Sequence, residues 1–419
     1  MRRPNPSVPM RRLARWVGPI SGAVLVAHTV LTSGATTTPH QVKVAALIAP
    51  AAPAPLPHPS SRQTVTIPSS IDATGTKDVT IGLNHFFEHL RSGTTVVFPP
   101  HATYRAEGTL VLLDKLNLTI DGNGSTLKAK TDGSGAAPTP GRAFEWPRSR
   151  ASILVEGSHN VRIENLVISG PNDPGGPGSY RPMLEAQAGV DVEGSGNVAV
   201  VRCVIRHTFG DFVYISGWSE NVQVLDNSLN SNGRQGVSVT NARDVLIEGN
   251  EIYRAARSAI DLEPNTAAGM ALDVDIYDNN IVAAGLGFVA AEGAGSHVDY
   301  VNVVGNRLID MPMTIKVRAS DGAPRHNWGV FDNWSDVVAG SPVAPIEFYY
   351  VSQVTIEGNH QAMASDRPSV AIYMVYPCDW SMAYNSFPGA EATEPQGIAG
   401  PRCQWRNEAT DPPGPGSGK

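Results

Sequence analysis

The chain of 419 residues has no excess of basic charge. It carries 32 Lys and Arg residues against 39 Asp and Glu residues, which gives a formal net charge of -7 at pH 7. This balance provides no broad basic surface for a phosphate backbone, so the composition argues against nucleic-acid binding. Hydrophobic residues make up 41% of the chain, with 41 Gly and 33 Pro. Such a composition is typical of a well-buried protein with many turns.

Cysteine and the usual zinc motifs are scarce. The three cysteines are Cys203, Cys378 and Cys403. In an exported protein Cys378 and Cys403 could form a disulfide that holds the last segment, which would leave Cys203 unpaired. The sequence has no HExxH motif and no paired CxxC motif, and we identify no cluster of histidines, so no metal site is predicted and zinc is not expected.

The apolar segment near the N-terminus is too short to cross a bilayer. VGPISGAVLVAHTVL, at 17–31, is interrupted by Pro19 and His28, and its length of about 15 residues falls short of the roughly 20 that a spanning helix needs. Five arginines precede it and small polar residues follow it, which is the pattern of a secretory signal peptide. We therefore predict a signal peptide over 1–35 and a secreted or cell-envelope protein without a stable membrane span; an uncleaved signal anchor is the alternative.

Two further segments have a composition that favours no packed structure. Residues 36–62 contain APAAPAPLPHPSS, and the chain ends in DPPGPGSGK. Segments so rich in Pro, Ala, Gly and Ser are typical of linkers and tails. We predict a linker over 36–62 that does not pack, a folded domain over 63–405 and a disordered tail over 406–419.

The folded part repeats a short pattern. Segments such as VQVLDNSL (222–229), VDIYDNNI (274–281) and VNVVGNRL (301–308) start with two apolar residues one apart and carry Asn at the sixth position. Asn holds that position in seven of nine aligned segments, at steps of 23 to 29 residues: Asn227, Asn250, Asn279, Asn306, Asn333, Asn359 and Asn385. Cys203 takes the same position in an earlier segment. A fixed period of this length is the signature of a repeat architecture.

A second short strand lies between these segments, for example VYI (213–215), VSV (237–239) and IDL (260–262). Equivalent strands recur only after a full period, so they must stack in parallel, and crossovers of that kind are right-handed. The sequence predicts an all-β fold, a right-handed parallel β-helix. Its Asn side chains should stack in one column, with Cys203 as a buried, inert thiol in that column.

The first residues of the folded part carry a resemblance to a known family. DVTIGLNHFFEHL (78–90) has apolar residues at helical spacing, which predicts a short N-terminal capping α-helix. This helix, followed by TTVVFPPHATY, LTIDGNGSTL and the Asn-bearing coils, resembles the pectin lyase-like superfamily of right-handed β-helix proteins, over about 63 to 390. The superfamily contains lyases, hydrolases, epimerases and non-catalytic spikes, so the resemblance implies a fold and not one reaction.

The outward residues of the second strand column form the predicted binding face. Equivalent positions on successive coils stack about 4.8 Å apart. A long polar face with aromatic side chains suits a polysaccharide better than a small molecule, and the insertion at 170–187 is expected to form one wall. The predicted substrate-binding residues are Asp191, Glu193, Tyr214, Trp218, Lys316, Arg318 and Tyr349.

Asp261 and Glu263, in AIDLEPN, are the candidate catalytic carboxylates. Two residues apart on a strand, they have a backbone separation of about 6.6 Å, at the lower edge of the roughly 6.5–9.5 Å associated with inverting glycoside hydrolysis. Arg234, one coil below, is expected to bind a substrate carboxylate or to keep one acid ionised. The competing interpretation is that both acids are ordinary outward polar positions of a strand.

Three functional interpretations stay open. The first is a monomeric, exported polysaccharide hydrolase, with Asp261 and Glu263 as acid and base. The second is a polysaccharide lyase of the pectate lyase type; the resemblance implies that a Lys or Arg such as Lys316 or Arg318 would abstract the proton α to a carboxylate, often with Ca²⁺. The third is a non-catalytic module that binds a cell-wall or envelope glycan.

No cofactor is predicted apart from this weak case for Ca²⁺. The four acids Asp191, Glu193, Asp261 and Glu263 could supply oxygen ligands, but Asp191 and Asp261 stand three coils, about 14 Å, apart and cannot share one ion. The motif sets of the polygalacturonases and of the alginate epimerases are absent from the sequence. No catalytic signature of a known family can therefore be transferred to this chain.

Overall fold

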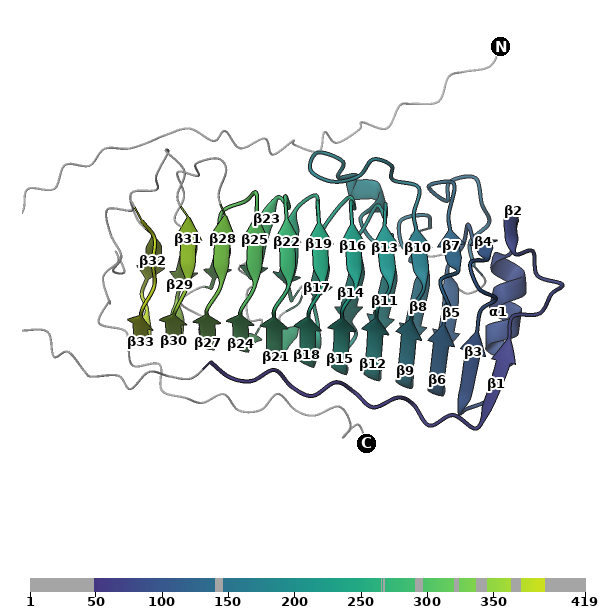
Figure 1. Ribbon diagram of the computed structural model, residues 1–419, viewed down its shortest axis with the longest axis horizontal. Helices are drawn as coiled ribbons and strands as arrows, with labels where there is room; N and C mark the ends of the chain where they lie inside the picture. Colours follow the sequence, from purple (N-terminus) through teal and green to yellow (C-terminus); the bar gives the residue numbers. More distant parts are fainter. Residues whose placement is uncertain are drawn as a thin grey trace, which may run out of the picture. The chain divides into compact units, whose positions relative to one another are not determined.

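The computed structural model describes residues 49–139, 146–264, 266, 268–290, 297–319, 324–336, 345–362 and 371–388. These residues form a right-handed parallel β-helix whose coils stack along one axis (Figure 1). Successive coils contribute one strand to each of three parallel sheets of 12, 11 and 10 strands. The predicted fold class is confirmed, with three strands in a full coil.

We call the three sheets A, B and C. Sheet A contains β1 (Gln63–Thr66), β3 (Thr94–Val97), β6 (Leu116–Asp121), β9 (His159–Glu164), β12 (Gly196–Val201), β15 (Ser219–Leu225), β18 (Ala242–Glu248), β21 (Met270–Tyr277), β24 (His297–Val304), β27 (Arg325–Phe331), β30 (Val351–Glu357) and β33 (Cys378–Ala383). Sheet B contains β2 (Thr74–Asp78), β4 (Thr103–Arg105), β7 (Thr126–Lys128), β10 (Val167–Ser169), β13 (Val204–Arg206), β16 (Ser228–Asn230), β19 (Glu251–Tyr253), β22 (Asn280–Val282), β25 (Arg307–Ile309), β28 (Trp334–Asp336) and β31 (His360–Ala362). Sheet C contains β5 (Leu110–Leu113), β8 (Ile153–Glu156), β11 (Val190–Glu193), β14 (Val213–Ser216), β17 (Val237–Val239), β20 (Ser258–Leu262), β23 (Leu286–Ala290), β26 (Ile315–Arg318), β29 (Ile346–Tyr349) and β32 (Ile372–Val375). The helices are α1 (Thr80–Glu88) and the short 3-10 helix η1 (Pro182–Leu184).

The bore of the solenoid is filled by the alternate residues of each strand. Val222 and Val224 on β15, Leu229 on β16 and Ile260 on β20 are fully buried, and they belong to one continuous hydrophobic core that extends through the coils. Burial of one such side chain contributes about 1.5–3 kcal/mol relative to its exposure. The opposite residues of each strand point away from the bore, so the residues of each outward column can be identified from the sequence.

The asparagine column lies at the turn between sheets A and B, and it is confirmed from Asn227 to Asn385. The Asn250 amide group donates to the Val224 carbonyl at 2.8 Å and to Asn279 Oδ1 at 2.9 Å. Asn227 Oδ1 accepts from the backbone N–H of Cys203 at 2.9 Å, so the column continues to that residue. Cys203 is free and buried, and burial raises the pKa of its thiol to about 12. It is the inert residue that the repeat predicts.

Helix α1 covers the N-terminal end of the solenoid, as predicted. Leu83 and Phe87 are buried against the core. The helix begins at Thr80, because Asp78 still pairs with Arg105 in sheet B. The Asp78 carboxylate then accepts from the backbone N–H of Thr80 at 3.0 Å and from its hydroxyl at 2.6 Å, which satisfies polar groups at the start of the helix.

Residues 49–62 lie against the outer face of sheet A, in contrast to the predicted linker that does not pack (Figure 1). Gln223 holds this segment with two hydrogen bonds, accepting from Leu56 N at 2.7 Å and donating to the Ala54 carbonyl at 3.1 Å. Leu56, with Ala49 and Ala52, packs on an apolar strip of outward side chains: Ala199, Val201, Leu225, Leu246, Tyr277, Val304 and Phe331. An extended Pro-rich chain suits this contact because Pro has no backbone N–H to leave unsatisfied.

Several predictions concern residues outside the described part of the chain. The signal peptide over 1–35, the rest of the linker and the tail over 406–419 lie there and stay predictions. Cys378 is disulfide-bonded, and Cys403 lies outside the described residues. Within the described ranges, no helix has both the length and the apolar character that a membrane span requires.

The hydrogen bonds of the asparagine column should contribute strongly to the free energy of unfolding. Asn279 is 1% exposed and exchanges hydrogen bonds with both neighbouring coils. Asn279→Ala leaves buried donors and acceptors unpaired, so we expect a loss of at least about 2 kcal/mol in urea unfolding. The control is Asn302→Ala, whose outward amide bonds to Asp275 and which should cost less than about 1 kcal/mol. Equal losses in the two variants would contradict this role of the column.

The packed segment should be released when its anchor is removed. Gln223→Ala deletes both hydrogen bonds to residues 54 and 56, so we expect faster proteolytic cleavage within 49–62 and stronger binding of a hydrophobic dye to the apolar strip. Glu220→Ala, on the same strand β15 but with a half-exposed side chain that does not contact residues 54 and 56, should leave both readouts unchanged. A Gln223→Ala variant that is cleaved no faster than the parent protein would show that the segment is held in another way.

Candidate functional site

Arg234 lies at the centre of a cluster of carboxylates, in the turn before β17. Its Nη1 atom donates to Asp211 Oδ2 at 2.7 Å, and its Nη2 atom donates to Glu263 Oε2 at 2.9 Å. Its Nε atom is 3.9 Å from Glu185 Oε2. Asp211 precedes β14 and Glu263 follows β20, so one guanidinium links three successive coils. The structure therefore brings the predicted pair Arg234 and Glu263 into direct contact.

Asp261, on β20, points out of the bore but is not exposed. Only 2% of its surface is accessible, so the prediction of a solvent-facing position is wrong in this respect. The turn that carries Arg234 and Gln235 covers it, and Gln235 Nε2 donates to Asp261 Oδ2 at 2.5 Å. Oδ1 of Asp261 has no hydrogen-bond partner among the residues that the structure describes. Glu263, with 33% of its side chain accessible, is the more exposed of the two acids.

A second column of polar side chains supports this site at the corner before sheet C. The backbone N–H of Gln235 donates to Asp211 Oδ1 at 2.9 Å, and the backbone N–H of Ser258 donates to Gln235 Oε1 at 2.7 Å. Asp211 and Gln235 are not among the site residues predicted from the sequence. The signal that could have identified them is positional, because each stands two residues before the first inward residue of its sheet C strand.

Asp261, Asp211 and Arg234 have different electrostatic surroundings. Burial, together with the nearby charges of Glu263 and Asp211, raises the pKa of Asp261 well above its ordinary value. Burial raises the pKa of Asp211 to about 6, against the opposing effect of the Arg234 charge. Burial alone would lower the pKa of Arg234, but the carboxylates around it raise that pKa above its ordinary value. The cluster therefore combines a permanently charged guanidinium with a carboxyl group, Asp261, whose pKa is raised.

The insertion at 170–187 reaches the cluster, as expected for a wall of the site. Glu185 accepts hydrogen bonds from the Tyr180 hydroxyl and from Arg148, and the Arg257 guanidinium lies 5.1 Å from the centre of the Tyr180 ring. Beyond Glu185 the insertion borders an open cavity of about 700 Å³, whose lining includes Asp132, Trp146, Arg148, Tyr180, Arg181 and Met183. The cavity could not be predicted from the sequence because its lining comes from irregular loops.

The predicted binding residues nearer the N-terminus lie on the same face but outside the Arg234 cluster. Asp191 and Glu193 are on β11, in register with Tyr214 and Ser216 of β14. The Tyr214 hydroxyl accepts a hydrogen bond from Thr240 Oγ1 at 3.1 Å, and burial raises the pKa of Tyr214. Trp218 follows β14 in the next turn and is 42% exposed.

Lys316, Arg318 and Tyr349 form a separate group farther along sheet C. Lys316 Nζ is 3.5 Å from Glu347 Oε1, and Arg318 Nη2 is 3.4 Å from Glu347 Oε2. The Arg318 guanidinium lies 5.4 Å from the centre of the Tyr349 ring. The group pairs internally and makes no contact with Arg234.

From the sequence we predict that the outward positions of this strand start at Thr314, which would place Lys316 in the column of Glu263. The register of the structure differs from this prediction. Lys316 pairs with Val289, which pairs with Asp261, so Lys316 stacks in the column of Asp261 and not in that of Glu263. The reason is that Thr314 does not belong to the strand: its hydroxyl donates to the Pro312 carbonyl at 3.2 Å, and β26 begins at Ile315.

Comparison with known proteins defines the class of this chain. Residues 148–322 match a family model described as a right handed beta helix region. Together with the three parallel sheets, this match makes the chain a right-handed parallel β-helix protein, which is the fold that the resemblance to the pectin lyase-like superfamily implies. A search of curated protein sequences finds no match.

Solved structures with the same fold include both enzymes and a binding protein. The chain is similar to PfbA, a surface adhesin of Streptococcus pneumoniae, with 11% identity and a TM-score of 0.52 over 77% of this chain and 93% of that one. It is similar to a family 28 exopolygalacturonase of Yersinia enterocolitica, with 12% identity and a TM-score of 0.50 over 77% and 78% of the two chains. A hyperthermoactive exopolygalacturonase of Thermotoga maritima gives 12% identity and a TM-score of 0.50 over 79% and 90%. At these identities the likeness shows the fold alone.

The raised pKa of Asp261 should appear in the pH dependence of stability. Between the ordinary pKa of 3.8 and the raised value, the folded protein binds a proton that the unfolded chain releases, so stability falls as pH rises. Asp261→Asn cannot ionise and should lack this decline. The parent protein should therefore lose up to about 1.4 kcal/mol more than the variant for each pH unit in that window.

The measurement is urea unfolding of both proteins from pH 4 to pH 9. Asp244→Asn is the matched control, because Asp244 is an exposed acid on sheet A and its replacement should retain the decline of the parent protein. Parallel pH profiles for the parent and Asp261→Asn would show that Asp261 ionises in the folded protein much as it does in the unfolded chain.

Proposed function

We propose that this protein is an exported carbohydrate-active β-helix protein that binds a polysaccharide along the outward face of sheet C and hydrolyses it at the Arg234 cluster. One observation carries the proposal: Asp261 and Glu263, two residues apart, have opposite environments. Asp261 is buried with a raised pKa, whereas Glu263 is partly exposed and bound to a guanidinium. Carboxyl groups held in different protonation states are what general acid and general base catalysis of glycoside hydrolysis requires.

The roles follow from these environments. The proton of Asp261 would pass to the glycosidic oxygen as the bond between that oxygen and the anomeric carbon breaks. Glu263 would take a proton from the water molecule that attacks the anomeric carbon, so one proton enters and one leaves the pair of acids. Arg234 would orient Glu263 through its hydrogen bond of 2.9 Å. The Oδ1 atom of Asp261 is buried and lacks a partner among the described residues; it would give up its proton only after the covering turn with Arg234 and Gln235 has moved aside.

The cavity beside the insertion supports a polymer as the ligand. Trp146 and Tyr180 offer aromatic faces for stacking on sugar rings, and Arg148 and Arg181 offer guanidinium groups for hydroxyl or carboxylate groups, all within one lining. Arg148 and Tyr180 both bind Glu185, which approaches Arg234. The cavity would thus hold a sugar unit next to the one that reacts.

A second candidate function is glycan binding without catalysis. The observation that favours it is the near-complete burial of Asp261, together with the pairing of Arg234 to carboxylates on both sides, which also suits a purely structural cluster. The fold similarity to a surface adhesin is compatible with this alternative. The lyase alternative rests on Lys316 and Arg318, and it requires that their pairing with Glu347 open.

The test is an assay of the purified protein on a panel of neutral and acidic polysaccharides, including polygalacturonate. We expect new reducing ends without new ultraviolet absorbance, and a loss of at least about 100-fold in turnover for both Asp261→Asn and Glu263→Gln. The control Asp244→Asn, on sheet A, should keep the activity of the parent protein.

Other outcomes separate the alternatives. Products that absorb in the ultraviolet, with activity lost in Lys316→Ala and kept in Glu263→Gln, would replace hydrolysis by lyase chemistry. Binding of a polymer without any turnover would establish the glycan-binding function in place of the enzyme. If the protein neither binds nor hydrolyses any polysaccharide of the panel, the proposal is rejected as a whole.

A further inference from the structure

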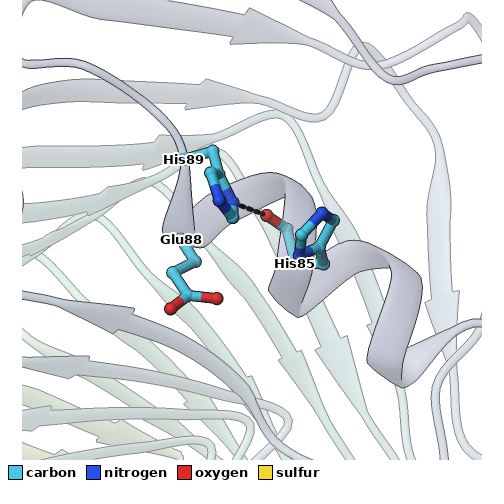
Figure 2. Close-up of side chains that lie close together, drawn as sticks. All are labelled: His85, Glu88 and His89. Carbon is cyan, nitrogen blue, oxygen red and sulfur yellow. Dashed lines mark hydrogen bonds between the residues drawn. The ribbon is translucent and has the colours of Figure 1, made fainter.

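Helix α1 and its C-cap residue His89 present three possible metal ligands, far along the chain from the Arg234 cluster. His85, Glu88 and His89 occupy positions i, i+3 and i+4, which neighbour each other on a helix. Their ligand atoms all lie within 4.8 Å of one another, and all three residues are exposed. Figure 2 shows the three side chains around the last turn of the helix. It is the one group of three such ligands within the described ranges.

The helix that carries these residues is held firmly in place. Leu83 is fully buried and Phe87 is 3% exposed, both packed against the end of the core. Lys115 Nζ donates to the backbone carbonyl of Glu88 at 3.0 Å, which ties the last turn to the first coils. Because the buried face is fixed, the opposite face with the two histidines has a defined orientation. A site on a rigid element is positioned more accurately than one on a loop.

One hydrogen bond prepares His89 for coordination. Its Nδ1 atom is 2.7 Å from the backbone carbonyl oxygen of His85 (Figure 2), so Nδ1 carries the hydrogen and Nε2 keeps a free lone pair. Metal-binding histidines in proteins usually donate their other ring N–H in this way. The rings of His85 and His89 lie 4.4 Å apart between centroids. The negative end of the helix dipole, at this same last turn, also favours a cation.

We propose that His85, Glu88 and His89 form a binding site for a divalent cation of the zinc class. Two imidazoles and one carboxylate are ligands that zinc prefers, whereas Ca²⁺ and Mg²⁺ prefer oxygen alone. Zinc to ligand distances of about 2.0–2.2 Å require the ligand atoms to approach more closely than 4.8 Å, which exposed side chains achieve by rotation about their side-chain bonds. The sequence prediction of no zinc site and no histidine cluster overlooked this His-x-x-Glu-His pattern.

The fourth position of a tetrahedral site would be open. His85 and His89 both border a groove of about 570 Å³ between α1 and the first strands, together with Gln63, Ile71 and Arg91. A zinc ion with three protein ligands keeps one position for water or for an exchangeable ligand. The site would therefore hold the ion reversibly while stiffening the helix that covers the end of the solenoid.

The test is calorimetric titration of the full chain, without an affinity tag, with Zn²⁺ alone. We expect one equivalent of zinc that is lost, or weakened at least about tenfold, in both His85→Ala and His89→Ala, and a smaller weakening in Glu88→Gln. His58→Ala is the matched control, since His58 is exposed and lies outside the cluster, and it should bind like the parent protein. Hydrogen exchange of residues 80–89 should slow on addition of zinc in the parent protein and not in His89→Ala.

The variants remain informative because the three ligands are exposed and their replacement leaves the core intact, which circular dichroism without metal will verify. Zinc binding that survives unchanged in both histidine variants would assign the ion to other residues and overturn the proposal. No binding at 100-fold more zinc than protein would overturn it as well. The polysaccharide assay does not depend on this site, so the two proposals fail independently.

Discussion

The hydrogen bonds of the asparagine column are the constraint on which the rest of this structure depends. At each passage from sheet A to sheet B, the chain turns inside a dry region, and a buried polar group without a partner is costly there. The Asn side chain accepts from a backbone N–H of the coil before it and donates to a carbonyl of that coil, as Asn250 does with Asn227 N at 3.0 Å and the Val224 carbonyl at 2.8 Å. Each coil is thereby locked in register with the next, and a slip of one residue would break the whole column.

The locked register decides what the outward face can do. Residues 23 or 29 positions apart in the chain, such as Arg234 with Asp211 and Glu263, come within hydrogen-bond distance because they belong to successive coils. Stacking also forces like charges together, and Asp261 is held close to the carboxylates of Glu263 and Asp211, which Arg234 bridges. A carboxyl group whose pKa is strongly shifted by burial and by neighbouring charges is a recognised sign of a functional site.

The sequence predicts the fold well because the period is visible in single residues. The asparagines from Asn227 to Asn385 mark the turn between sheets A and B, and apolar residues such as Ile260 and Leu262 mark the inward positions. The positions of the strands can be deduced from these two markers. The cover over Asp261 could not be predicted, since it depends on how the irregular turn with Arg234 and Gln235 folds back on β20. The position of Lys316 was wrong for a similar reason, because the beginning of a strand depends on a local hydrogen bond of Thr314. The prediction from composition that residues 49–62 do not pack was wrong, because an apolar strip on the outer face of sheet A gives this Pro-rich segment a surface on which to pack.

The central claim is that the Arg234 cluster and the cavity beside it form the place where a glycan is bound. The most direct measurement is a crystal structure of the Asp261→Asn variant with an oligosaccharide from the polymer that the protein binds best. We expect a sugar unit in contact with the Glu263 carboxylate and Arg234, and another stacked on Trp146 or Tyr180. An oligosaccharide bound only elsewhere, for example along sheet A or beside Tyr349, would contradict this claim.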